Sequence, residues 1–325
     1  MTPLRVAIVA GEESGDLLGA DLVAALSRLT GRSVEIVGVG GRHLEALGLT
    51  SLFNSSDIAL MGITAILKDL PRLVKRIGQT AEAIVRANPD CLITIDSPDF
   101  SLRVAKKVRA ADPTIPIVHY VCPSVWAWRP GRAPAMRPYV DRILCVLPFE
   151  PAALEKLDGP PGTYVGHRLS ADENVAIAAA QQVDRAKERS HRRRLLVLPG
   201  SRRSEVNRLL GPFRDAVKIL AERGNTFEVT IPTVPHVASL VEASTSDWPI
   251  KPTIVQEHSE KWRAFAHADA ALAASGTVLL ELALCRVPTV SCYKTDPFIG
   301  PLMRRLVTVW SAALPNLIAD WPVVP

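Results

Sequence analysis

The fold class can be inferred from residues 4–16, which have the sequence LRVAIVAGEESGD. Its first seven residues form a nearly continuous apolar run, which predicts a strand buried on both faces of a sheet. A glycine-bearing turn follows at Gly11, and a helical pattern begins after it. A strand, a turn and a helix in this order are typical of a parallel sheet with crossover helices.

The same unit recurs along the chain, so we predict the α/β class. Short apolar runs alternate with longer helical patterns in both halves. The expected strands are Leu4–Ala10, Val34–Gly38, Cys91–Asp96, Ile117–Val121 and Ile143–Leu147 in the first half, and Leu195–Leu198, Phe227–Ile231, Thr253–Val255, Ala270–Ala274 and Thr289–Cys292 in the second. Each half therefore starts a sheet of its own, which predicts two Rossmann-like parallel-sheet domains.

A turn-forming cluster, Asp158-Gly159-Pro160-Pro161-Gly162, separates the two sets of strands. The 325 residues also exceed the usual size of one hydrophobic core. We place the boundary near residue 168, which divides the chain into domains 1–168 and 169–325. Ligands bind at the carboxyl ends of strands in such sheets, so we expect the two domains to face each other across a cleft.

The composition bounds the classes of partner. A net charge of +5 and a pI near 9.0 suit nucleic acid, anionic lipid or phosphorylated small molecules. No element interleaves a basic stripe with aromatic residues, so a nucleic-acid-binding protein is disfavoured. The five cysteines form no Cys-x-x-Cys pair and lie mostly in apolar runs, which indicates free buried thiols.

The amino-terminal sequence predicts a cytoplasmic location. The first predicted strand begins at Leu4, which leaves no room for a signal peptide, and no apolar run approaches membrane-spanning length. The oligomeric state stays open, with a homodimer as the candidate assembly.

The first turn favours a sugar over a dinucleotide. Its spacing is not G-x-G-x-x-G, and the adjacent Glu12 and Glu13 would oppose a phosphate. Carboxylates with Ser14 suit sugar hydroxyls, which makes Glu12, Ser14 and Gly15 candidate substrate-binding residues. The alternative is structural: Ser14 caps the helix and the acids complement its dipole.

The third predicted strand ends in Ile95-Asp96-Ser97-Pro98-Asp99. A carboxylate at this edge can take a proton from an attacking hydroxyl group. The alternative is an aspartate that forms a turn or caps a helix before proline. A Pro-bounded loop after the fourth strand carries Trp126 and Trp128, which could stack on a sugar or acyl chain or could anchor the loop.

Two turns of the second half have the outline of a diphosphate site. Leu198-Pro199-Gly200-Ser201-Arg202 joins a strand to a helix, where helix N–H groups and Arg202 can neutralise a leaving diphosphate. Ala274-Ser275-Gly276-Thr277 joins another strand to another helix. Glu281 lies one helical turn beyond Thr277, where it could accept hydrogen bonds from ribose hydroxyls. The alternatives are surface arginines and an exposed helix glutamate.

Together these turns resemble the lipid-A-disaccharide synthase family. The resemblance covers nearly the whole chain and rests on residues 10–16, 123–128, 198–202 and 274–277, with further matches at 95–100, 147–150, 165–167 and 314–317. It implies a two-Rossmann GT-B glycosyltransferase that joins UDP-2,3-diacylglucosamine to 2,3-diacylglucosamine 1-phosphate with inversion and releases UDP. It implies no metal and no cofactor.

The resemblance also implies residue roles. Asp96 is the catalytic carboxylate, and Arg202 contacts the diphosphate. The donor site is lined by Ser201, Ser275, Gly276, Thr277, Glu281 and Asn316. The first domain takes the acceptor and faces the membrane, and the second domain binds the UDP-sugar. The alternative within this fold is a UDP-N-acetylglucosamine transferase or epimerase with a soluble substrate.

The sequence departs from the family's pattern in two places. Family members continue past the position of Pro325 with helices that complete the nucleotide pocket, so the chain looks cut short. The family's Met-Gly-x-x-Glu segment has Ala65 at the acidic position, which puts an acceptor role for that acid in doubt.

Residues 61–77 combine apolar residues at helical spacing with basic ones. This pattern predicts peripheral attachment to the inner face of the cytoplasmic membrane, or else a packed crossover helix. The apolar residues are Ile63, Ile66, Leu67, Leu70, Leu73, Val74 and Ile77.

Overall fold

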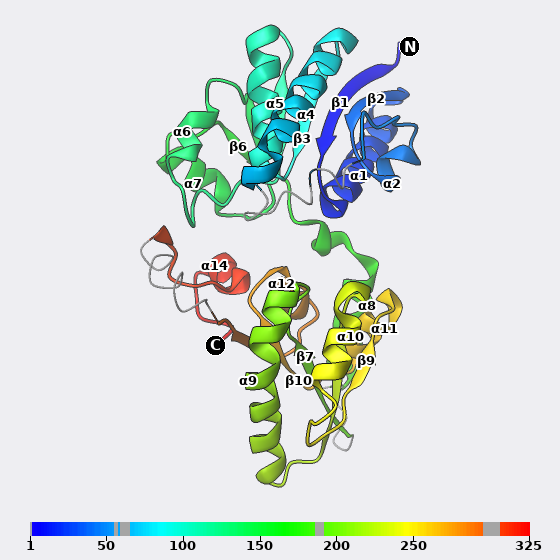
Figure 1. Cartoon of the computed structure of the whole chain (residues 1–325), viewed down its shortest axis with the longest axis vertical. Coiled ribbons are helices and arrows are strands. Elements are labelled where there is room, and N and C mark those ends of the chain that lie inside the picture. Colours follow the sequence, from blue (N-terminus) through cyan, green and yellow to red (C-terminus); the bar gives the residue numbers. More distant parts are fainter. Residues whose placement is uncertain (1, 55–57, 59–65, 186–191, 295–305) are drawn as a thin grey trace. The chain divides into compact units, whose positions relative to one another are not determined.

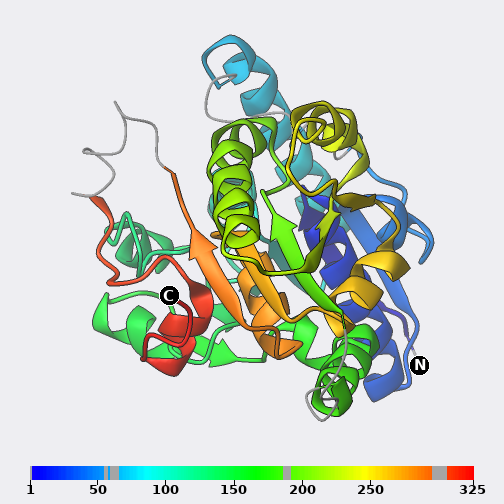
Figure 2. The same cartoon turned by 90° about the horizontal axis from the view of Figure 1, so that it is seen from below.

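The computed structural model describes residues 2–54, 58, 66–185, 192–294 and 306–325. The chain divides into two compact units, Met1–Gly166 and His167–Pro325. Each unit is an open parallel sheet whose strands alternate with helices (Figures 1 and 2). The predicted fold class, two parallel-sheet α/β domains, is confirmed.

The first unit holds a six-stranded sheet of order β2-β1-β3-β4-β5-β6. Its strands are β1 Leu4–Ala10, β2 Val34–Val39, β3 Cys91–Ile95, β4 Ile117–Tyr120, β5 Arg142–Cys145 and β6 Gly162–Tyr164. Its helices are α1 Glu13–Thr30, α2 Arg42–Glu45, α4 Ile66–Ala87, α5 Pro98–Ala111, α6 Arg132–Met136 and α7 Glu150–Lys156. The strand order reverses between β1 and β3, which is where ligands bind in open parallel sheets.

The second unit holds a five-stranded sheet of order β11-β10-β7-β8-β9. Its strands are β7 Arg193–Leu198, β8 Phe227–Pro232, β9 Thr253–Val255, β10 Ala270–Ala274 and β11 Thr289–Cys292. Its helices are α8 Glu173–Arg185, α9 Arg203–Glu222, α10 Pro235–Ser244, α11 His258–Ala266, α12 Thr277–Leu284 and α14 Leu314–Ala319, with a 3₁₀ turn at Arg168–Ala171. Here the order reverses between β7 and β10.

Strand β1 shows why the apolar runs form central strands. Ala7 and Val9 pack on one face of the sheet with α4 and α5, and Val6, Ile8 and Ala10 pack on the other with α1 and α2. A strand buried on both faces needs apolar side chains at every position rather than at alternate ones. The second sheet is covered in the same way, by α9 and α10 on one face and by α8, α11 and α12 on the other.

All ten predicted strands are present, with ends that agree within two residues. The strand expected at Ile143–Leu147 stops at Cys145 because the next two N–H groups, of Val146 and Leu147, donate to the Glu150 carboxylate. Strand β6 was not predicted from the sequence; it has three residues and pairs with β5 at the sheet edge. Its glycine and the prolines before it indicate a turn, so only the pairing reveals it.

Candidate functional site

A pocket of about 500 Å³ lies at the carboxyl edge of the second sheet. Its walls come from the turns that follow β7, β8, β9 and β10, so it spans the point where the strand order reverses. Six of the residues that the sequence predicted for a donor site line it: Ser201, Arg202, Ser275, Gly276, Thr277 and Glu281. The fold therefore brings together two turns that are more than seventy residues apart in the sequence.

The turn after β7 presents a cation at a helix start. Gly200 has a φ of +104°, and a Cβ there would lie 2.4 Å from a carboxylate oxygen of Glu205, so only glycine fits. Arg202 is the N-cap residue of α9, and its Nη1 lies 2.8 Å from Glu205 Oε1. The Arg202 side chain is 79% exposed, and such an exposed ion pair is worth at most about 1 kcal/mol, so an anion can compete for the guanidinium.

The turn after β10 presents a second helix start. Thr277 and Gly276 are exposed at the beginning of α12, whose first N–H groups have no partners within the helix. Ser275 is fixed from both sides, because its N–H donates to the Cys292 carbonyl and its hydroxyl donates to the Ala312 carbonyl. Two helix N-termini thus border one pocket, which favours an anionic ligand.

The pocket wall includes a lysine that the sequence analysis missed. Lys261 Nζ lies 2.6 Å from a carboxylate oxygen of Glu281, and both side chains are largely buried. The same ammonium group lies 4.8 Å from the centroid of the Trp262 ring. Lys261 lies in α11, the helix after β9, and the strand–turn–helix argument applied to the other turns would have selected this helix too.

Asn316 does not line this pocket. Its side chain is buried and donates to Ser311 Oγ and to the Val324 carbonyl, while its own oxygen accepts the Val324 N–H. Through these hydrogen bonds the Asn316 side-chain amide holds the segment after α14 in place. The geometry thus favours a structural role over the donor contact that the resemblance implies.

A second pocket, of about 650 Å³, lies in the first unit. Its lining includes Glu12, Glu13 and Asp16 from the turn after β1, together with Arg42. Asp16 accepts the N–H groups of three residues at the start of α2, Gly41, His43 and Leu44, so its carboxylate holds that segment in place. Glu13 forms an ion pair with Arg42.

The other two residues predicted from this turn are placed differently. Gly15 is buried in α1, where it faces Ile95 of β3, and a Cβ there would meet Ile95 Cγ2 at an ordinary contact distance of 3.5 Å. Ser14 is exposed but is not among the lining residues of the pocket. It does not cap the helix, because α1 begins after Glu12, which makes no side-chain cap bond. The acids of the first turn do complement the helix dipole, as the structural alternative proposed.

Asp96 lies in a strained turn between β3 and α5. Asp96 and Ser97 have φ values of +48° and +44°, a conformation that costs non-glycine residues of order 1 kcal/mol or more each. Ser101 of α5 supports the turn by donating to the Asp96 carbonyl at 2.6 Å. Among the residues that the structure describes, the half-buried Asp96 carboxylate has no hydrogen bond or ion pair. Asp99, in contrast, pairs with Arg132 at 2.7 Å.

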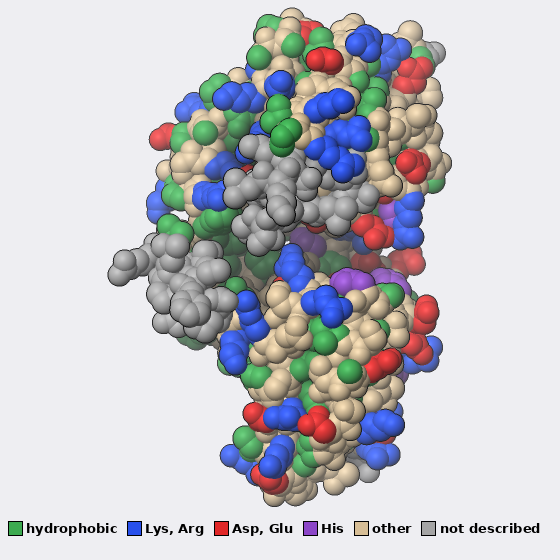
Figure 3. All heavy atoms as spheres, viewed as in Figure 1, with side chains coloured by type: hydrophobic (Ala, Val, Ile, Leu, Met, Phe, Trp, Pro, Cys, Tyr) green, Lys and Arg blue, Asp and Glu red, His purple; other side chains and the backbone are tan. Residues whose placement is uncertain are grey.

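The predicted membrane segment is only partly described. Met61–Ala65, including the alanine at the acidic position, and the side chains of residues 66–70 lie outside the described residues. Leu73 and Ile77 pack in the core, so for them the crossover-helix alternative is correct, whereas Val74 is 51% exposed. Figure 3 shows Lys and Arg side chains over the region of α4 and α5, where Arg72, Lys75, Arg103, Lys106 and Lys107 are exposed.

A search of the described helices finds none that is both long and apolar enough to cross a membrane.

Comparisons with known proteins agree with these features. A family model described as lipid-A-disaccharide synthetase matches residues 6–325. The lipid-A-disaccharide synthase of Rhodopseudomonas palustris (strain HaA2) is 47% identical over 322 residues, which are 99% of this chain and 81% of that protein. The lipid-A-disaccharide synthase of Nitrobacter winogradskyi is 46% identical over 321 residues, with the same coverage of 99% and 81%.

Solved structures share the fold at low sequence identity. A UDP-GlcNAc 2-epimerase from Neisseria meningitidis, bound to UDP-GlcNAc, is similar with a TM-score of 0.60 and 12% identity, covering 98% of this chain and 90% of that one. Acinetobacter baumannii MurG is similar with a TM-score of 0.52 and 12% identity, covering 94% and 83%. The fold is therefore that of GT-B glycosyltransferases and epimerases. With the family match over nearly its whole length, the chain belongs to the lipid-A-disaccharide synthase family of UDP-sugar glycosyltransferases.

Proposed function

We propose that the chain joins UDP-2,3-diacylglucosamine to 2,3-diacylglucosamine 1-phosphate, giving the lipid A disaccharide 1-phosphate and UDP. The observation that carries the proposal is the pocket of the second unit, where two helix N-termini, Arg202 and Lys261 meet at the switch point of the sheet. This arrangement suits a nucleoside diphosphate group, because fixed positive groups surround the place where charge develops on the leaving group.

The nucleotide would occupy the pocket in a defined direction. The diphosphate would lie against the starts of α9 and α12, beside Arg202. Glu281, on the pocket wall, would accept hydrogen bonds from the ribose hydroxyls, and its ion pair with Lys261 would hold the carboxylate in place. The volume of about 500 Å³ is within the usual range of ligand pockets, roughly 300–1,000 Å³.

Asp96 would act as the general base. Its carboxylate accepts the proton of the acceptor's 6-hydroxyl while that oxygen forms a bond to the anomeric carbon and the bond to the UDP oxygen breaks. One displacement inverts the configuration. We assign the acceptor to the first unit, whose pocket around Glu12, Glu13 and Arg42 offers hydrogen-bonding partners for sugar hydroxyls.

Peripheral attachment to the cytoplasmic face of the membrane is part of the proposal, because both proposed substrates carry acyl chains. The basic side chains of α4 and α5 suit anionic lipid headgroups. Sedimentation with anionic and with neutral vesicles tests it: binding to anionic vesicles that is lost at high salt supports attachment, and no binding to either opposes it.

The function is tested by product release. UDP formation is measured with acylated and with unacylated UDP-glucosamine donors, each with and without acceptor, and UDP and NAD are titrated separately. We expect UDP to bind and NAD not to bind, and turnover to require acyl chains and acceptor. Turnover of UDP-N-acetylglucosamine without acyl dependence would favour the alternative of a transferase or epimerase with a soluble substrate.

A further inference from the structure

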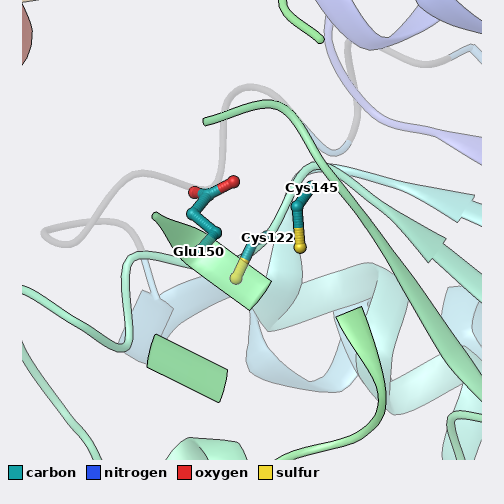
Figure 4. Close-up of side chains that lie close together, drawn as sticks. All are labelled: Cys122, Cys145 and Glu150. Carbon is teal, nitrogen blue, oxygen red and sulfur yellow. The ribbon is translucent and has the colours of Figure 1, made fainter. Parts of the chain in front are cut away.

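Two thiols and a carboxylate meet in the core of the first unit, and none of the three residues lines either pocket. Cys122 follows β4, Cys145 ends β5 and Glu150 begins α7 (Figure 4). All three residues are buried, and their two Sγ atoms and a carboxylate oxygen lie within 4.8 Å of one another. The proposed transfer reaction uses none of them.

The carboxylate is already oriented. Glu150 Oε2 accepts the N–H groups of Val146 and Leu147 at 3.0 and 2.9 Å, and Oε1 accepts the Trp126 indole N–H at 3.2 Å. Each carboxylate oxygen offers two acceptor directions, so Oε1 keeps one. The three donors are neutral, and no ion pair to Glu150 is found in the described part of the chain. Burial raises the pKa of Glu150, and these hydrogen bonds oppose that rise.

The thiols complete a donor set for a soft cation. The hydrogen bond with Cys145 and burial both raise the pKa of Cys122, so without a cation the thiol stays protonated. Thiolates select Zn²⁺ and Cu⁺ among biological metals. A tetrahedral Zn²⁺ has ligands at about 2.0–2.3 Å, which puts them about 3.8 Å or less apart. The two sulfur atoms therefore need to approach each other by about 1 Å at most, and a sulfur and the carboxylate oxygen by about 1.3 Å at most.

We propose that Cys122, Cys145 and Glu150 bind a soft d¹⁰ cation, with Zn²⁺ as the representative ion. On binding, Zn²⁺ replaces the protons of the two thiols, both protons pass to solvent, and no electron is transferred. Three protein ligands leave one position for water. The ion would join the loop after β4 to β5 and α7, and through Glu150 it would fix Trp126, whose ring packs edge-on at 5.0 Å against Phe149.

Stoichiometric metal uptake tests this site. The full chain is freed of metal with a chelator and titrated with Zn²⁺ against a chromophoric competitor in weakly buffered solution. We expect one Zn²⁺ per chain, release of about two protons, and tighter binding at higher pH because the thiols must be deprotonated. Co²⁺ in place of Zn²⁺ should give the charge-transfer absorption of cobalt thiolates, a readout on the unsubstituted protein.

Matched variants locate the site. C122S and C145S should each abolish stoichiometric uptake, E150Q should weaken it at least tenfold, and C285S, which removes a buried thiol from the second unit, should leave it unchanged. Melting curves without metal separate these effects from loss of the fold. The proposal is wrong if the chain takes up no stoichiometric Zn²⁺, if Co²⁺ gives no thiolate absorption, if C285S has the same effect as C122S, or if Cys122 and Cys145 form a disulfide instead.

Discussion

The Nζ atom of Lys261 lies 2.6 Å from a carboxylate oxygen of Glu281 on the wall of the second unit's pocket. The two residues come from α11 and α12, so the contact exists only because the fold packs these helices on one face of the sheet. The pair therefore places an ammonium group, which suits a diphosphate, next to a carboxylate, which suits ribose hydroxyls, on the same wall of the pocket.

We expect Lys261→Met to weaken UDP binding about tenfold or more, because it removes a positive charge and leaves Glu281 unpaired beside an anion. The added substitution Glu281→Gln should restore part of the loss. Isothermal titration with UDP measures both effects. Lys218→Met is the matched control, since Lys218 pairs with Glu222 on α9 outside the pocket. Unchanged UDP affinity in Lys261→Met would remove this wall from the nucleotide site.

Arg202→Ala should weaken UDP binding and slow turnover by about tenfold or more, because in the proposed site the guanidinium would contact the diphosphate before and during bond breaking. Arg202→Lys should recover only part, since lysine has no bidentate geometry. Arg203→Ala provides the comparison, because Arg203 is the next residue but does not line the pocket. Equal effects of the two alanine substitutions on UDP affinity would show that only the general charge of the turn matters.

Asp16→Ala should lower the stability of the first unit by about 1–3 kcal/mol, because the N–H groups of Gly41, His43 and Leu44 lose a charged acceptor. The midpoint of chemical denaturation measures this loss. Ser14→Ala, on the same turn but exposed, should stay within about 0.5 kcal/mol of the unsubstituted chain. A loss in Ser14→Ala as large as that in Asp16→Ala would contradict the assignment of Asp16 as the residue that fixes α2.

His119 predicts a pH dependence of stability. Burial, followed by the charge of Arg132, lowers its pKa from 6.5 to about 3. Between these values the unfolded chain takes up a proton and the folded chain does not, so stability is fully present above pH 6.5 and falls as the pH decreases, by up to about 1.4 kcal/mol per pH unit. Denaturation midpoints at pH 7 and pH 5 should differ less in His119→Gln than in the unsubstituted chain. His43→Gln should keep the difference, and an undiminished slope in His119→Gln would refute the assignment.

The sequence predicts the sheets well because a strand segment buried on both faces must be apolar at every position, as β10 is throughout and β1 is from Val6 to Ala10. It also selects the turns that line the second unit's pocket, since the ends of parallel strands meet at one edge. What it cannot predict depends on contacts between distant segments. Asp16 meets partners 25 to 28 residues away, and Lys261 meets Glu281 from another helix.

Unusual backbone conformation is a second feature that the sequence does not predict. Asp96 and Ser97 adopt the left-handed conformation although neither is glycine, so no residue type in the sequence indicates it. The strand predicted from the sequence therefore ends at Asp96, one residue beyond the observed end of β3. Contacts with another segment decide the role of Asn316, whose motif implies a ligand contact while its side chain holds the segment around Val324. Motifs thus identify residues whose roles depend on where the backbone directs them.

We propose that Asp96 takes the proton of the acceptor while the second unit holds the nucleotide. Its turn is strained, and Ser101 supports the Asp96 carbonyl, so the carboxylate is held by the backbone rather than by an ion pair in the described residues. Asp99 offers a matched control on the same loop, since its carboxylate pairs with Arg132.

The general-base role of Asp96 is tested by kcat for Asp96→Asn, with UDP affinity determined on the same preparation. The amide keeps the shape but cannot accept a proton, so we predict that kcat falls about a hundred- to ten-thousandfold while UDP affinity and melting temperature stay near those of the unsubstituted chain. Asp99→Asn should be the milder change. Asp96 is not the general base if Asp96→Asn turns over at the unsubstituted rate, or if both variants lose activity and melting temperature equally.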